Sequence, residues 1–131
     1  MIYGIGIDLA SIERIQRVIL KWGDRFLSRV FTPGEKEICE RRAVPFSAFA
    51  LRFAAKEAFS KALGIGMRNG IRWRDIEVYN HTSGKPDLKL HGAALNFCNY
   101  EGITGIHLSL SDDGKYAIAM VVLEAKRQEA L

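Results

Sequence analysis

The residues best suited to chemistry lie in a single run, which reads in order Arg52-Phe53-Ala54-Ala55-Lys56-Glu57-Ala58-Phe59-Ser60-Lys61-Ala62-Leu63-Gly64. Nearly every face of the helix that this run predicts is apolar, and such a helix is usually buried. Buried charges are costly unless they are paired or bind an ion. Glu57 and Lys61 nevertheless lie four residues apart on one face. The carboxylate could bind a hard cation and the ammonium could bind phosphate oxygens. The alternative is an ordinary helix ion pair, worth ~0.5 kcal/mol or less.

A second carboxylate follows the first predicted strand. Residues 2–7 read as a short, glycine-containing strand that runs into Asp8. An Asp in that position can simply cap the next helix. Its functional interpretation needs a second carboxylate, because Mg²⁺ is commonly held by one or two carboxylates together with substrate phosphates and water. Asp8 and Glu57 supply that pair if the strand end packs beside the helix.

Three polar side chains share one face of a later predicted strand. His107, Ser109 and Ser111 alternate with leucines, so they form a polar wall for an anionic ligand, unless the strand is simply half exposed. Ser-His-Asp hydrolysis is weakly supported because no G-x-S-x-G motif is present. The histidines are too scattered for a zinc site, and the glycines of residues 64–70 match neither a Walker nor a dinucleotide-binding loop.

A basic stripe marks another predicted helix. Arg14, Arg17 and Lys21 line it, and Arg25 continues it if the helix crosses Gly23. The stripe is either a solvated face or a surface for an acidic partner, which the net charge of +4 would also suit. No aromatic platform or helix-turn-helix signature favours nucleic acid. An acidic protein is the better interpretation, because surfaces of opposite charge steer association.

Caps, glycines and prolines predict the elements that must position these residues. Helices are expected at residues 12–22 after a cap at Ser11, from Pro33 to about residue 42 after a capping box, at 46–63 before Gly64, and at 92–100. Strands are expected at 75–79, 86–90, 105–111 and 115–124, the last two joined at Asp112-Asp113-Gly114, with a polar helical tail at 125–131. This order indicates an α+β fold in which a small antiparallel sheet packs on a long central helix.

Composition favours one domain over residues 1–131. The chain is 48% hydrophobic and shows no linker or fixed-period repeat. Cys39 and Cys98 form no C-x-x-C pair and fit small core-filling roles in a reducing compartment. The first residues lack a signal-peptide pattern, and no window approaches the ~18 apolar residues of a membrane helix. We therefore expect a cytoplasmic protein that binds neither membrane nor nucleic acid.

Three of these stretches together resemble the bacterial holo-[acyl-carrier-protein] synthases, the short 4′-phosphopantetheinyl transferases of fatty-acid synthesis. They are Gly4-Ile5-Gly6-Ile7-Asp8, the run from Arg52 through Lys61 to Gly66, and His107-Leu108-Ser109-Leu110-Ser111. The resemblance covers essentially the whole chain in order, and the central run is its most specific part. In this family the last motif often ends in His, whereas Asp112 stands here, so the resemblance assigns that position no role.

The resemblance implies a reaction and its residues. Coenzyme A would donate its 4′-phosphopantetheine arm to a serine hydroxyl of apo acyl carrier protein, with release of 3′,5′-ADP. Asp8 and Glu57 would bind Mg²⁺ and Lys61 would stabilise phosphate charge, so these three are the expected catalytic residues. The acceptor of the serine proton stays open between a metal-linked water and a carboxylate.

Binding residues and an assembly follow from the same resemblance. The expected contacts of coenzyme A are Lys61, Gly64, Lys85, His107 and Ser109, and those of the carrier protein are Arg14, Lys21, Arg25 and Phe26. Family members are typically homotrimers with the active site between subunits. Neighbouring subunits would give a chain of 131 residues the walls that a ligand as long as coenzyme A needs.

Two other classes of function stay open at this point. A small basic binding module would hold nucleic acid or an acidic protein, with binding that weakens steeply with salt and does not depend on Mg²⁺. A metal-dependent hydrolase would use the same carboxylates and release phosphopantetheine to water.

Overall fold

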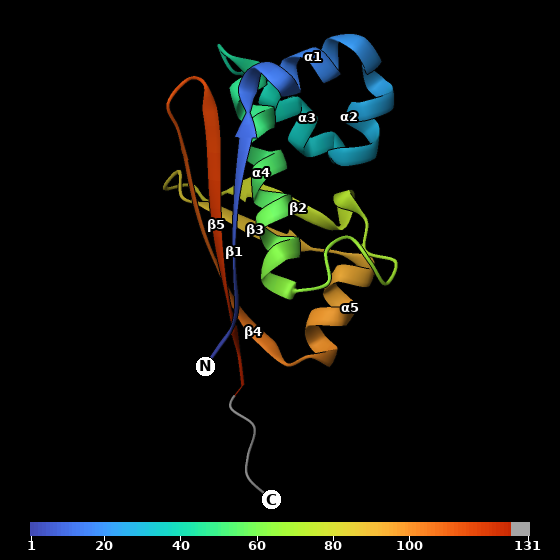
Figure 1. Ribbon diagram of the computed structural model, residues 1–131, viewed down its shortest axis with the longest axis vertical. Coiled ribbons are helices and arrows are strands. Elements are labelled where there is room, and N and C mark those ends of the chain that lie inside the picture. Colours follow the sequence, from blue (N-terminus) through green and yellow to red (C-terminus); the bar gives the residue numbers. More distant parts are fainter. Residues whose placement is uncertain (127–131) are drawn as a thin grey trace, which may run out of the picture.

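Helix α4, Pro45–Leu63, runs through the middle of the molecule in the computed structural model, which describes residues 1–126 (Figure 1). A three-stranded antiparallel sheet lies along it in the order β1-β5-β4. These strands are β1 Ile2–Ser11, β5 Tyr116–Ala125 and β4 Ile103–Asp112. A separate two-stranded sheet, β2 Ile76–Asn80 with β3 Pro86–Leu90, crosses α4 (Figure 1). The α+β class with a small antiparallel sheet on a long helix is therefore confirmed, although the strands divide into two sheets.

Four further helices and one 3₁₀ turn complete the described chain. They are α1 Ile12–Trp22, α2 Asp24–Val30, α3 Pro33–Glu40, the 3₁₀ turn η1 Trp73–Asp75, and α5 Gly92–Tyr100. Helices α1, α2 and α3 gather at one end of α4, and α5 lies near the other (Figure 1). No helix within residues 1–126 is long and apolar enough to span a membrane.

Small residues let α4 pack directly on the sheet. Gly4 and Gly6 of β1 lie against the helix backbone, where an added Cβ would come within 2.0 Å of the carbonyl oxygen of Ala62 and within 1.8 Å of that of Ala58. Two residues along a strand span ~6.6 Å and one helical turn spans ~5.4 Å, so the two glycines match two successive turns of the helix. The expected glycine-containing strand thus has a steric function, because it holds β1 against the helix that carries Glu57.

Local caps shape the three N-terminal helices. The Ser11 hydroxyl accepts a hydrogen bond from the Arg14 amide at 3.2 Å, and the capping box of Thr32 and Glu35 forms as expected. The basic helix does not cross Gly23, which adopts φ +54° and ends α1. The separate helix α2 follows, which was not expected because seven residues are too few for a clear periodic pattern.

Strand boundaries differ from expectation where pairing extends a strand. Asp8 was expected at the end of the first strand, but β1 continues to Ser11, which pairs with Tyr116 of β5. Residue 125 was expected to begin a polar helical tail, but Ala125 ends β5, and residues 127–131 lie outside the described part. Asp113 lies in the turn as expected, whereas Asp112 was also expected in the turn but is the last residue of β4, where it pairs with Ala117. The carboxylate of Asp112 accepts a hydrogen bond from the Gly114 amide, and that of Asp113 accepts from the amides of Lys115 and Tyr116.

Candidate active site

Asp8, Glu57 and Lys61 line one surface hollow of about 360 Å³ between β1 and α4. Asp8 reaches it because it is paired with the buried Ala119 of β5 and therefore shares the sheet face that packs on α4. The first turn of α1 contributes Arg14 to the same hollow. The three residues expected to be catalytic are thus brought together, although 48 residues of chain lie between Asp8 and Glu57.

The charges of Asp8, Glu57 and Lys61 interact with one another. The Lys61 ammonium donates hydrogen bonds to Asp8 Oδ1 and to the Ile7 carbonyl oxygen, each at 3.0 Å. Burial raises the pKa of Glu57, the negative charge of Asp8 raises this pKa further, and the charge of Lys61 opposes both. A cation between the two carboxylates would relieve that repulsion. Among the described ion pairs, Lys61 pairs with Asp8 and not with Glu57.

The buried charges of α4 are not those that we expected. The Lys61 side chain is 53% exposed and Glu57 is half buried. Lys56 is instead wholly buried and Arg52 is nearly so. The expectation failed because α4 is covered on several sides, and the apolar run alone does not tell which positions face the open hollow.

A buried network accounts for Lys56. Its ammonium donates to Glu35 Oε1 at 2.8 Å, to the Trp73 carbonyl oxygen at 3.0 Å and to the Ile76 carbonyl oxygen. Glu35 also accepts hydrogen bonds from the amides of Thr32 and Val78. Glu35 was recognised only as a capping residue, because nothing in the sequence links it to a lysine 21 positions later. The network fixes α4, α3 and β2 together, and so fixes the helix that carries Glu57.

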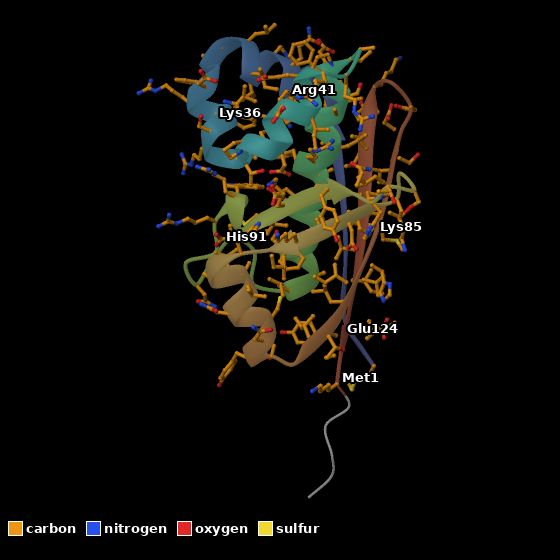
Figure 2. The ribbon with its side chains drawn as sticks, turned by 180° about the vertical axis from the view of Figure 1, so that it is seen from behind. Met1, Lys36, Arg41, Lys85, His91 and Glu124 are labelled. Carbon is orange, nitrogen blue, oxygen red and sulfur yellow. The ribbon has the colours of Figure 1, made fainter. Side chains whose placement is uncertain are left out.

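Other residues expected to bind coenzyme A do not reach the hollow of this chain. Gly64 caps the C-terminus of α4 with φ +83°. Lys85 lies in the turn between β2 and β3. His107 and Ser109 are exposed on the sheet face opposite Asp8, and His107 pairs with Glu124. Figure 2 shows Lys85 and Glu124 toward one flank of the molecule, away from His91.

The residues expected to bind a carrier protein do lie next to the hollow. Arg14 lines both the hollow and a second depression, which also contains Lys21. Arg25 and Phe26 line a third, joined to the second through Val18 and Trp22. Although Gly23 breaks the helix, α1 and α2 therefore present one continuous surface.

Comparisons with known proteins identify the family. The model of the 4′-phosphopantetheinyl transferase superfamily matches residues 4–121. The chain therefore belongs to the 4′-phosphopantetheinyl transferase superfamily. More particularly, it is 50% identical over 124 residues to the holo-[acyl-carrier-protein] synthase of Geobacter sulfurreducens, covering 95% of this chain and 98% of the relative.

Solved structures agree with this assignment. The holo-[acyl-carrier-protein] synthase of Neisseria meningitidis is 40% identical with a TM-score of 0.89, covering 95% of this chain and 99% of the other. The holo-(acyl-carrier-protein) synthase of Bacillus anthracis, in complex with CoA (3′,5′-ADP), is 36% identical with a TM-score of 0.79. The match covers 96% of this chain and 99% of the other. The resemblance seen in the sequence motifs is thus confirmed across nearly the whole fold.

Proposed function

We propose that this protein transfers the 4′-phosphopantetheine group from coenzyme A to a serine of an apo acyl carrier protein. The observation that carries the proposal is the shared hollow of Asp8, Glu57 and Lys61, in a chain whose relatives are holo-[acyl-carrier-protein] synthases. The relative from Bacillus anthracis supports the donor, because its structure is a complex with CoA (3′,5′-ADP). The product would serve fatty-acid synthesis in the cytoplasm.

The reaction is a displacement at the phosphorus that carries the pantetheine arm. The serine oxygen forms the new bond to that phosphorus, the pyrophosphate bond breaks, and 3′,5′-ADP leaves with the bridging oxygen. The serine proton passes to a base, which is either water or a carboxylate at the site. Lys61 stabilises charge on the phosphate oxygens, and removing a preorganised group of this kind can cost ~3 kcal/mol of barrier.

The residues of the hollow fit a magnesium ion. Asp8 and Glu57 offer hard oxygen ligands, and the pKa of Glu57 is raised first by its burial and then by the negative charge of Asp8. Within residues 1–126 no cluster of three or more potential ligands exists, so phosphate oxygens and water would complete the coordination. When bound, the ion would neutralise the charge of the pyrophosphate and orient it.

The outer sheet face supports a homotrimer. Ile5, Ile7 and Leu9 of β1 and Ile118 and Met120 of β5 point away from α4, with between 37% and 62% of each residue exposed. A contiguous apolar face of this kind marks an interface. In a trimer it would meet a second copy of the chain, and His107 and Ser109 on the same face would lie near a neighbour's hollow.

Mass spectrometry tests the proposed activity. The protein is mixed with apo acyl carrier protein, coenzyme A and Mg²⁺, and the carrier protein is weighed. We expect a gain of one phosphopantetheine that disappears when a chelator removes the metal. An unchanged carrier mass would refute the transferase, and free phosphopantetheine without carrier modification would indicate a hydrolase.

A further inference from the structure

A surface track leads from the candidate active site across α1 and α2 to η1. Four depressions lie in succession, and each shares a lining residue with the next: Arg14 joins the first two, Val18 and Trp22 the second pair, and Arg29 the third pair. The last depression, about 610 Å³, contains Arg29, Arg72 and Arg74. We call these three arginines the distal cluster; none of them stands out in the sequence as a binding residue.

The charges of the distal cluster are available to a partner. None of its arginines takes part in an ion pair among residues 1–126. The two carboxylates of the same depression are already engaged. Glu77 accepts hydrogen bonds from Thr32 at 2.7 Å and interacts with His91 at 3.0 Å, and Asp75 accepts one from the Arg72 amide at 3.0 Å.

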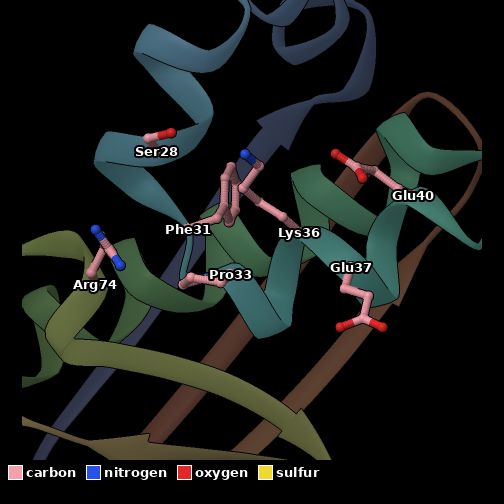
Figure 3. Close-up of a pocket in the computed structure, with 7 residues that line it drawn as sticks. All are labelled: Ser28, Phe31, Pro33, Lys36, Glu37, Glu40 and Arg74. Carbon is pink, nitrogen blue, oxygen red and sulfur yellow. The ribbon is translucent and has the colours of Figure 1, made fainter.

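The adjoining surface shows where the positive track ends. Figure 3 shows a neighbouring hollow with Arg74 at one end and Glu40 at the other. Glu37 also lines this hollow, and it pairs with Arg41. Lys36 lines this hollow too and pairs with Asp24. Charges of both signs therefore follow Arg74, so the run of basic residues ends there.

The fold holds the distal cluster at a fixed position relative to the active site. Trp73, between Arg72 and Arg74, stacks on Phe53 of α4 with ring centroids 5.2 Å apart. The Trp73 carbonyl oxygen accepts a hydrogen bond from buried Lys56. Phe53 also lines the hollow that contains Glu57. A partner bound at η1 is therefore kept at a fixed distance and orientation relative to that hollow.

We propose that Arg29, Arg72 and Arg74 form a second anchoring site for the acidic carrier protein, beyond the first helix. The inference rests on the proposed function. Between its charged ends the track carries Val18, Trp22 and Phe26, and an apolar centre with a charged rim is typical of a protein interface. Nucleic acid fits less well, because Phe26 packs against Phe31 and Phe53 and is not a free stacking platform.

Kinetics and direct binding test the distal cluster. In the double variant Arg72→Gln/Arg74→Gln, KM for the carrier protein should rise about threefold to tenfold, as expected for losing two solvent-exposed charge pairs. The kcat value and KM for coenzyme A should not change, because neither arginine lines the hollow of Glu57. The salt dependence of carrier binding should become shallower.

Matched variants make the outcome decisive. Arg42→Gln/Lys126→Gln removes the same charge from exposed residues outside the track and should keep wild-type KM, whereas Arg72→Lys/Arg74→Lys should recover most of the affinity. Equal KM for the carrier protein in the two glutamine variants would overturn the proposal. So would an Arg72→Gln/Arg74→Gln variant that no longer binds duplex DNA but binds the carrier protein as wild type does. Fluorescence anisotropy with labelled apo carrier protein measures binding without turnover. It therefore decides the inference even if transfer itself is absent, a result that would refute only the proposed function.

Discussion

At the scale of residues, the hollow between β1 and α4 contains two carboxylates, Asp8 and Glu57, that repel each other. It also contains one ammonium, that of Lys61. Lys61 pairs with Asp8, whereas the pKa of Glu57 is raised by its burial and by Asp8. This asymmetry leaves Glu57 as the carboxylate that gains most from a bound cation. This arrangement is what the proposed binding of Mg²⁺ and substrate phosphates would require.

We expect Glu57→Gln to abolish transfer while leaving the fold intact. The amide removes one negative metal ligand, but it also removes a charge that is disfavoured in the folded state, because a raised carboxyl pKa favours the neutral form. Above the raised pKa the ionised Glu57 costs stability, so at pH 7 without Mg²⁺ the variant should unfold at the same temperature as wild type or higher.

Calorimetry and the transfer assay check this prediction together. Mg²⁺ with coenzyme A should raise the unfolding temperature of wild type and of the control Glu101→Gln, which changes an exposed residue just after α5. It should not raise that of Glu57→Gln. Near-normal transfer by Glu57→Gln would remove this residue from the metal site.

At the scale of elements, the site depends on how closely β1 and α4 approach. An added Cβ on Gly6 would lie 1.8 Å from the Ala58 carbonyl oxygen, which is backbone and cannot turn aside. The capping box of α3 contributes in a different way, because its Glu35 extends into the core and pairs with Lys56 of α4. Steric fit sets the distance between strand and helix, and the ion pair sets the placement of the helix.

Gly6→Ala should reduce stability and activity together. The strand must move away from the helix, which typically costs ~1–3 kcal/mol for overpacking and separates Asp8 from Glu57. Gly34→Ala is the matched control, since its Cβ would lie 3.4 Å from a movable Glu77 oxygen. Urea unfolding and transfer rates measure both effects, and a Gly6→Ala protein with wild-type stability would contradict the close packing.

Lys56→Met should be strongly destabilising. It leaves Glu35 fully buried without its cation, and breaking a buried pair typically costs ~3–5 kcal/mol. Lys36→Met removes a lysine that pairs with the exposed Asp24, so it should cost less than ~1 kcal/mol. Urea unfolding measures the free energy of unfolding of both variants. An equal decrease in the two would show that the buried pair stabilises the fold no more than the exposed one.

At the scale of the whole molecule, the chain presents an apolar outer sheet face and a basic track on different elements. The first is suited to copies of the same chain and the second to an acidic partner. Coenzyme A residues expected from the sequence are divided in the same way, since Lys61 lies in the hollow while His107 and Ser109 lie on the outer sheet face. Assembly is therefore the step that would unite them.

If the proposed homotrimer forms, we expect Ile7→Lys/Met120→Lys to abolish both the trimer and transfer without unfolding the chain. The two residues are paired across β1 and β5 and are 54% and 44% exposed, so lysines are tolerated in the monomer but repel across an interface. Leu20→Lys changes a more exposed residue on α1 and should stay trimeric. Analytical ultracentrifugation measures the mass of each, and a fully active monomeric double variant would refute the shared site.

Much of the fold and the core of the site could be predicted from local patterns. The caps at Ser11 and Thr32, the stop at Gly64 and strand Pro86–Leu90 follow from short-range chemistry, which the sequence carries directly. The motifs with Asp8, Glu57 and Lys61 indicated the family and its chemistry for the same reason. Helix α2 and the full length of β1 were not predicted, because a short helix has little periodicity and a strand extends only where a partner is present.

The sequence by itself therefore determined the types of groups at the site, the order of the main elements and the family. Only the tertiary structure decided which charges are buried, because burial depends on every neighbour of α4: Lys56 lies inside with Glu35, and Lys61 lies outside with Asp8. It also decided that Arg72 and Arg74 lie in the same depression as Arg29. Such proximity between distant segments results from packing, and no local pattern records it.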